Sequence, residues 1–249
     1  MDRFDAGLEA VTFFSNGCRL LGGFYRAAGN TRLPAVVLLH GAPGIEKHLD
    51  IAYRLRDRGC HCLYFHFRGS WGSEGAFSFT GLVDDAAAAV AWARSHPAVD
   101  PARIVLVGGA MGGHAALLLA AADPRIRATV AVCPLIDPRA FLLPESMAAE
   151  FAPMLKGVTP RDLSLQWNEV RPLPAMVDSL VGRSVLLVTA ERDELFPPSH
   201  YAGFIDRLPT CQHARAKDAD HAFSTCRPWL VRTVTDWIGA ELGIGASEP

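Results

Sequence analysis

The sequence predicts an α/β protein with a doubly wound, mostly parallel sheet that starts with antiparallel strands. Three observations favour this class. Short apolar runs such as PAVVLLHG (34–41) are typical of strands covered on both faces. Segments with helical spacing separate these runs, which favours parallel strands joined by crossover helices. An antiparallel hairpin precedes the first of these runs.

Most of the expected strands are apolar runs between turn residues. Two strands in 9–27 are joined at Ser15-Asn16-Gly17, a turn sequence. Further strands are expected, in chain order, in PAVVLLHG (34–41), CHCLYFHF (60–67), RIVLVGG (103–109), IRATVAVCP (126–134), SVLLVTA (184–190) and CQHARAK (211–217).

Helices are expected between these strands. Their segments are IEKHLDIAYRLRDRG (45–59), LVDDAAAAVAWARSH (82–96), GGHAALLLAAA (112–122), PSHYAGFIDRL (198–208) and TCRPWLVRTVTDWIGAEL (225–242). In the first of them, Leu49, Ala52, Tyr53 and Leu55 lie on one side and the charged residues on the other, and Gly59 ends the helix.

The chain has 249 residues and is 50% hydrophobic, which is enough for one large domain with a full core. We expect a single domain spanning 1–249. The irregular stretch 135–181 is rich in Pro, Leu, Met and Phe, and we interpret it as an insertion at the edge of the sheet that forms a small cap. Its large apolar side chains fit simple packing onto the sheet as well as a lining for an apolar pocket.

Composition and charge exclude several classes of function. With a net charge of −2, the chain shows no sign of a nucleic acid or an anionic membrane as partner. The six cysteines form no C-x-x-C pair, so we expect free thiols in a reducing compartment. The start, MDRFDAGLEA, does not read as a signal peptide, and no apolar run reaches the ~18 residues of a membrane span. We therefore expect a cytoplasmic protein. The sequence has no H-E-x-x-H motif, no phosphate loop and no lysine in a Schiff-base context, so we expect no metal or organic cofactor.

Chemistry-bearing residues follow the strands, where ligands bind in sheets of this kind. These stretches are HGAPG (40–44), RGSWGSEG (68–75), GGAMGG (108–113), AERD (190–193) and DADHAF (218–223). The third has the strand, glycine-rich turn and helix of a nucleophile elbow, but its tip is Ala110. A phosphate-binding helix start is the alternative; neither G-K-[ST] nor dinucleotide spacing is present.

Taken in order, these stretches resemble the α/β-hydrolase superfamily from about residue 10 to 240. The resemblance is to serine esterases and peptidase-like hydrolases with a dienelactone-hydrolase-like core, which carry H-G-x-x-G, a loop like F-R-G-x-x-G-S-E-G, G-x-S-x-G, and late D and D-H motifs. The one departure is Ala110 in place of serine. The resemblance implies a hydrolase of a carboxylic ester or related acyl bond that works through an acyl-enzyme.

The catalytic positions follow from the order nucleophile, acid, histidine. Ala110 takes the nucleophile position, His221 is the candidate base, and Asp193 is the acid that would orient it. Glu191 and Glu194 compete with Asp193, which matches the family position. For His221 the alternative is a capping or core histidine.

Two backbone donors are expected to bind the developing oxyanion. The N–H of Met111 lies at the start of the elbow helix. The resemblance gives the N–H of Ala42 as the second donor, because Pro43 has none.

Five other polar residues receive structural interpretations first. We expect His40 to brace its turn, Arg68 to form a structural salt bridge, Glu74 to face solvent or cap a turn, and His114 to pack. Cys133 is either a buried apolar thiol or, less favoured, a substitute nucleophile.

Alanine at the tip of the elbow leaves three hypotheses. In the first, which we favour, this chain is an inactivated variant of a serine enzyme whose substrate is a small ester or acyl compound with an apolar part. In the second, alanine is native and the protein is a pseudoenzyme that binds a small apolar ligand or a protein partner. In the third, the pair of His221 and Asp193 acts as a general base without a nucleophile.

Overall fold

A computed structural model describes residues 5–245, and an eight-stranded sheet runs through this part of the chain. Residues 1–4, which begin the acidic N-terminal stretch, and 246–249 lie outside the described residues. The order across the sheet is β1-β2-β4-β3-β5-β6-β7-β8. The strands are β1 (Gly7–Ser15), β2 (Cys18–Arg26), β3 (Leu33–Leu39), β4 (His61–Phe65), β5 (Val99–Gly109), β6 (Ala128–Val132), β7 (Val185–Ala190) and β8 (Gln212–Ala216).

Strand directions confirm the predicted fold class. β1 pairs antiparallel with β2, and β2 with β4, whereas all pairs among β3 to β8 are parallel. The β1–β2 hairpin turns at Asn16 and Gly17, whose φ angles of 47° and 79° suit a two-residue hairpin turn.

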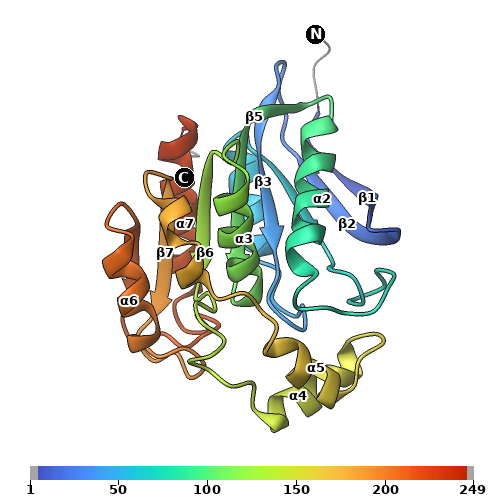
Figure 1. Ribbon diagram of the computed structural model, residues 1–249. Helices are drawn as coiled ribbons and strands as arrows, with labels where there is room; N and C mark the ends of the chain where they lie inside the picture. Colours follow the sequence, from blue (N-terminus) through green and yellow to red (C-terminus); the bar gives the residue numbers. More distant parts are fainter. Residues whose placement is uncertain (1–4, 246–249) are drawn as a thin grey trace.

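Helices cover both faces of the sheet. α2 and α3 pack together on one face, and α1 and α7 pack together on the other (Figure 1). The helices are α1 (Leu49–Asp57), α2 (Leu82–Ser95), α3 (Met111–Ala122), α4 (Glu145–Phe151), α5 (Pro160–Trp167), α6 (Ser199–Arg207) and α7 (Arg227–Leu242), with 3-10 turns η1 (Ala152–Met154), η2 (Leu173–Ala175) and η3 (Val177–Leu180).

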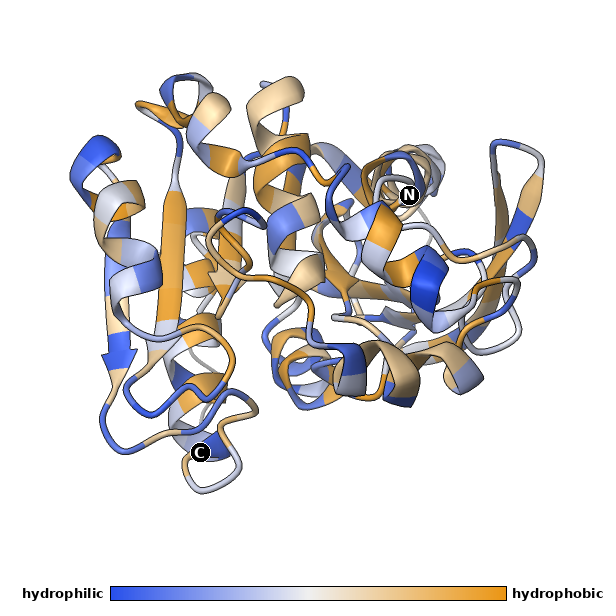
Figure 2. Ribbon diagram, turned by 60° about the horizontal axis from the view of Figure 1, so that its bottom comes forward, coloured by the Kyte–Doolittle hydropathy of each residue, from blue (hydrophilic) through white to orange (hydrophobic). Residues whose placement is uncertain are grey.

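The sheet divides the core into two layers because successive side chains of a strand point to opposite faces. In β3, Ala35, Val37 and Leu39 join the layer beneath α2 and α3. Val36 and Leu38 join the layer beneath α1 and α7. In Figure 2 the orange of hydrophobic residues runs along strands and also covers parts of the helices. Because both faces of the central strands are buried, their sequences are unbroken apolar runs.

The first helix differs from its prediction at its start and on its apolar side. α1 begins at Leu49 instead of near residue 45, because His48 has the left-handed angles φ 57° and ψ 35° and cannot continue a helix. Tyr53 is 48% exposed. Its ring packs edge-on against Tyr25, with centroids 4.8 Å apart, at the margin of the core.

The 135–181 segment lies beyond the carboxyl ends of the strands, where Figure 1 shows α4 and α5. Since β6 and β7 are neighbours inside the sheet, this is not an edge position, and that part of the expectation is wrong. Hydrogen bonds tie the segment to the loop after β4: Lys156 N donates to Gly69 O (2.7 Å), and Phe77 N to Lys156 O (2.9 Å). Its apolar residues Leu143, Leu155, Leu163 and Trp167 are buried in the same layer as α2 and α3.

No helix among residues 5–245 combines the length and the apolar character needed to cross a membrane.

Candidate functional site

Ala110 stands on a sharp turn between β5 and α3. Its angles of φ 48° and ψ −115° lie outside the regions that L-residues favour, a strain that costs about 1–3 kcal/mol and is typical of functional sites. Hydrogen bonds hold the turn: Ala110 N donates to Val132 O (2.9 Å), and His114 N donates to Ala110 O (3.0 Å). The chain therefore keeps the elbow conformation although the tip carries only a methyl group.

Glycines on either side of the tip let the elbow pack against its neighbours. A Cβ on Gly112 would lie 2.0 Å from Leu39 O, and one on Gly108 would lie 2.3 Å from Gly112 O. Real Cβ atoms do not come so close to a backbone oxygen. These glycines thus allow α3 to begin directly against the ends of β3 and β5, as the elbow motif requires.

His221 and Asp193 form a hydrogen-bonded pair. His221 Nδ1 lies 2.9 Å from each carboxylate oxygen of Asp193, and the carboxylate is buried. Asp193 also accepts the N–H groups of Leu195 (2.9 Å) and Phe196 (2.8 Å). Burial works to raise the pKa of Asp193, but the hydrogen bond from His221 and these backbone donors bring it below its usual value. The carboxylate is therefore ionised, and Nδ1 carries the proton that it accepts.

A cavity of about 420 Å³ brings most of the predicted residues together. Ala110, Ala42 and His221 all line it, and Asp193 stands behind His221. Because Nδ1 is bonded to Asp193, the Nε2 lone pair of the imidazole is free to act as a base. The walls near Ala110 are apolar, with Pro43, Val132, Phe151, Ala222 and Phe223.

The two predicted oxyanion donors are both placed near the tip. As the first residue of α3, Met111 has an N–H without a partner inside its helix. The turn after β3 approaches from the other side, since a Cβ on Gly41 would lie 3.2 Å from Ala110 Cβ. The Met111 side chain is buried and does not line the cavity, so only its backbone can take part.

Cys133 also lies close to Asp193 and His221. Cys133 Sγ, an Asp193 carboxylate oxygen and an imidazole nitrogen of His221 lie within 4.8 Å of one another, so a thiophilic divalent cation could reach all three. Such an ion would displace the hydrogen bond between His221 and Asp193. Burial, together with the Asp193 charge, raises the pKa of the Cys133 thiol well above its usual value. The thiol is thus protonated, which favours the buried-thiol interpretation over a substitute nucleophile.

Three structural interpretations hold. His40 Nδ1 contacts Gly41 O (2.8 Å) and its Nε2 accepts from Phe67 N, which ties the turn after β3 to the loop after β4. Arg68 pairs with the buried Asp85 at 2.6 Å. Glu74 pairs with Arg19 on the surface.

Among the residues of the cavity wall that the sequence did not single out are a histidine and an arginine. His48, at the start of α1, is buried against the elbow, and Arg227, at the start of α7, contacts it. The sequence places His48 inside an expected helix, and no motif links it to residue 227. Their proximity to the elbow follows only from the tertiary structure.

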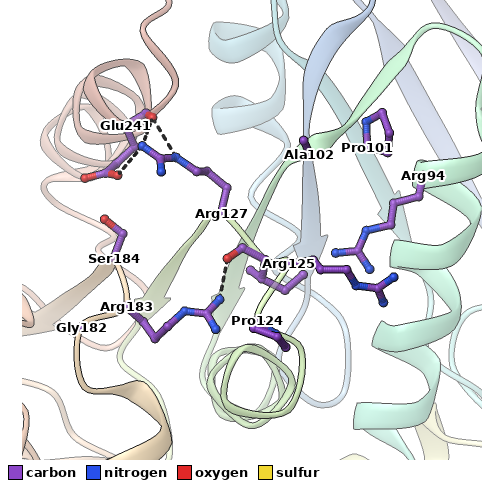
Figure 3. Close-up of a pocket in the computed structure, with 11 residues that line it drawn as sticks. Arg94, Pro101, Ala102, Pro124, Arg125, Arg127, Gly182, Arg183, Ser184 and Glu241 are labelled. Atoms are coloured by element: carbon purple, nitrogen blue, oxygen red, sulfur yellow. Dashed lines mark hydrogen bonds and ion pairs between the residues drawn. The ribbon is translucent and has the colours of Figure 1, made fainter.

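A larger cavity of about 710 Å³ lies away from the elbow (Figure 3). It contains none of the predicted residues, and its arginines already have partners: Arg94 pairs with Asp123, Arg127 contacts Glu241, and Arg183 donates to Ile126 O. It is reached from the amino ends of β6 and β7, whereas ligands of such sheets bind at the carboxyl ends. We therefore place the candidate site at the elbow.

Comparisons with known proteins agree on the fold. A profile of the prolyl oligopeptidase family matches residues 48–244. Quorum-quenching protein AidA of Acinetobacter baumannii is 28% identical over 208 residues, which are 80% of this chain and 64% of AidA, so the chain spans less than two thirds of that relative. A structure of DcsB with a substrate analogue has a TM-score of 0.80 at 21% identity and covers 95% of this chain and 100% of that one. The Pyrococcus furiosus esterase PF2001 has a TM-score of 0.75 at 20% identity, over 96% of this chain and 92% of the esterase.

Proposed function

The chain belongs to the prolyl oligopeptidase family and has the α/β-hydrolase fold, and from this we propose that it is built to hydrolyse a carboxylic ester or related acyl bond through an acyl-enzyme. The observation that carries the proposal is the strained turn at Ala110, which shares a cavity with His221 and, behind it, Asp193. We propose further that this chain is a form of the enzyme in which alanine has replaced the serine nucleophile.

With a serine hydroxyl at position 110, each residue has a defined role. The hydroxyl oxygen attacks the acyl carbon while His221 Nε2 takes its proton, and Asp193 stabilises the imidazolium. The N–H groups of Ala42 and Met111 donate to the oxyanion. The C–O bond to the leaving alcohol then breaks, and His221 returns the proton to that alcohol. Water attacks the acyl-enzyme by the same route and releases the carboxylic acid.

The cavity supports a substrate with an apolar part. Pro43, Val132 and Phe223 present apolar surface close to the elbow, and Phe151 of the cap adds an aromatic ring. Of the large apolar residues of the 135–181 segment, Phe151 is the one on this wall, whereas Leu155 and Trp167 are buried in the core. We propose that the segment acts as a fixed cap of the pocket. We propose an ester as the first substrate class to test, because the wall near the elbow is apolar and one structural neighbour is named an esterase, whereas the family name points to a peptide bond as the second class.

A second candidate rests on the same pair of residues. His221 keeps its Nε2 free and Asp193 keeps it oriented although position 110 has no nucleophile. Such a pair can activate a water molecule directly as a general base. This candidate predicts hydrolysis by the present chain that His221→Ala abolishes and a phosphonate leaves unchanged.

Labelling with a fluorophosphonate tests the proposal. The Ala110→Ser variant is expected to form a stable adduct on the peptide that spans residues 103–120, and the present chain is expected to form none. Labelling of the Ala110→Ser/His221→Ala variant should be slower by about 10²–10⁴, the usual contribution of a general base. An Ala110→Ser variant that folds but does not label would contradict the proposal.

A further inference from the structure

His48 stands directly beside the elbow, and nothing in the proposed acyl transfer uses it. Its side chain is 5% exposed and lines the same cavity as Ala110 and His221. A Cβ on Gly109 would lie 2.4 Å from His48 Nε2, so the absence of a side chain at 109 is what lets the imidazole reach this place. The left-handed backbone of His48 turns the chain toward the elbow before α1 begins.

The neighbours of His48 select one tautomer. Arg227 Nη2 lies 3.1 Å from His48 Nδ1, and a guanidinium can only donate, so Nδ1 carries the lone pair and Nε2 carries the hydrogen. Arg227 is itself held by Asp50, whose carboxylate takes its Nε at 2.6 Å and its Nη2 at 2.8 Å, and by Glu46 at 3.1 Å. Burial, followed by the charge of Arg227, lowers the pKa of His48 to about 4. The imidazole is therefore a neutral donor at physiological pH.

Within residues 5–245 the hydrogen bonds found for His48 involve its Nδ1 and its backbone N–H and C=O groups, and none involves the Nε2–H. The imidazole is enclosed, so a ligand that supplies a hydrogen-bond acceptor for this N–H binds with a more favourable free energy than one that does not. The charged residues that line the cavity are three carboxylates, those of Glu46, Glu150 and Glu194, and one guanidinium, that of Arg227, which pairs with Glu46. The carboxylates of Glu150 and Glu194 remain, and they oppose an anionic group there. The acceptor that this site fits is a neutral oxygen.

We propose that His48 is a substrate-binding residue whose Nε2–H donates to a second, neutral oxygen of the substrate, such as a keto, ether or hydroxyl oxygen close to the scissile carbonyl. This inference deepens the proposed function and rests on it for the position of the reacting carbonyl. It makes the site selective for acyl groups that carry an oxygen near the ester over purely hydrocarbon acyl groups.

Since Ala110 cannot form an acyl-enzyme, the affinity of an intact ester can be measured on the present chain. Phenyl methoxyacetate and phenyl butanoate differ by one oxygen in place of one methylene group. NMR titration gives the ratio of the dissociation constant of the methoxyacetate to that of the butanoate. In His48→Ala this ratio is expected to rise about 3–10-fold, because the methoxyacetate loses one neutral hydrogen bond. His48→Gln, which retains a donor near the Nε2 position, should keep the ratio, and so should His96→Ala, outside the cavity.

A second variant guards against misfolding of His48→Ala. Gly109→Ala places a methyl group against the His48 imidazole and should displace it. The ratio of the two dissociation constants should then shift in the same direction as in His48→Ala. Long-range ¹H–¹⁵N correlation spectra of His48 should show a protonated Nε2 and a bare Nδ1 from pH 5.5 to 8. An unchanged ratio in both variants, or a protonated Nδ1 in this range, would overturn the inference. Failure of the Ala110→Ser variant to label, with the ratio still dependent on His48, would overturn the proposed function alone.

Discussion

The imidazole of His221 meets both carboxylate oxygens of Asp193 at 2.9 Å, and the same imidazole lines the cavity that holds the methyl group of Ala110. An acid, a base and an elbow from three different parts of the chain thus converge at the carboxyl end of the sheet. Such groups act as a unit, so the loss of one member removes most of the benefit of the others.

Asp193→Asn in the Ala110→Ser background tests the orienting role of the carboxylate. An amide at this position can present N–H to Nδ1 and favour the tautomer that has no free base at Nε2. We expect kcat to fall by about 10³–10⁴ with little change in KM, as removal of a triad acid typically does. Steady-state kinetics on p-nitrophenyl butanoate provides the measurement. A loss below tenfold would mean that Asp193 does not orient the base.

Ala110→Gly tests the strain at the elbow. Because φ is 48° and ψ is −115°, glycine relieves backbone strain at this position. We expect the free energy of unfolding, measured by urea denaturation, to rise by about 1 kcal/mol after the entropy cost of glycine is included. Ala115→Gly, inside α3, is the matched control and should lower it by about 1 kcal/mol or more. Destabilisation by both substitutions would indicate an unstrained elbow.

The buried pair of Arg68 and Asp85 predicts a large loss of stability. Asp85 has no exposed side-chain surface and accepts both the guanidinium and the backbone N–H of Arg68. Asp85→Asn leaves Arg68 without a compensating charge, and we expect a loss of about 3–5 kcal/mol in the free energy of unfolding. Arg125→Gln, in a surface pair with Asp123, should cost at most about 1 kcal/mol. Equal effects of the two substitutions would contradict this assignment.

Buried neutral histidines predict destabilisation in mild acid. Burial lowers the pKa of His40 to about 3, and those of His48 and His114 to about 4, against an ordinary value of 6.5. Between about pH 4 and 6.5 the unfolded chain therefore binds more protons than the folded one, so stability rises with pH in this window and is lost as pH falls. Each group contributes a slope of up to about 1.4 kcal/mol per pH unit.

Urea denaturation at pH 7 and pH 5 measures this dependence, and we expect the free energy of unfolding to be lower by more than about 2 kcal/mol at pH 5. His114→Gln removes one titrating group, so its slope should be smaller by about one proton. Equal stability at the two pH values would show that these imidazoles titrate normally in the folded protein.

The sequence was sufficient to predict the strands and the sheet class, because most of the strands are short apolar runs. Ala110, Asp193 and His221 each follow an expected strand, which predicted their place at the carboxyl end of the sheet, although the strand before His221, Gln212–Ala216, is not an apolar run. The catalytic roles of these three positions stay predictions. Apolar runs, glycines and the order of motifs are local signals, and local signals also predicted the turn at Asn16 and Gly17. The sequence predicted that Arg68 forms a structural salt bridge, but it did not predict Asp85 as the partner.

What the sequence did not predict depends on tertiary contacts. The left-handed backbone of His48 shortens α1, and no residue near it signals this conformation. The contact between His48 and Arg227 joins residues 179 positions apart. The location of the 135–181 segment depends on its bonds to the loop after β4, such as Lys156 N to Gly69 O, which have no periodic sequence signal. Helical spacing predicted that Tyr53 lies on the apolar side of its helix. Spacing does not show that the ring is half exposed and packs edge-on against Tyr25, because that contact depends on the tertiary structure.

The most direct test of the account is the esterase activity of Ala110→Ser. We expect kcat on p-nitrophenyl butanoate to rise by several orders of magnitude over the present chain, up to about 10⁶, the usual cost of a missing triad nucleophile. The Ala110→Ser/His221→Ala variant should lose most of that gain. A folded Ala110→Ser variant with no more activity than the present chain would contradict the central claim that position 110 is the nucleophile position of this site.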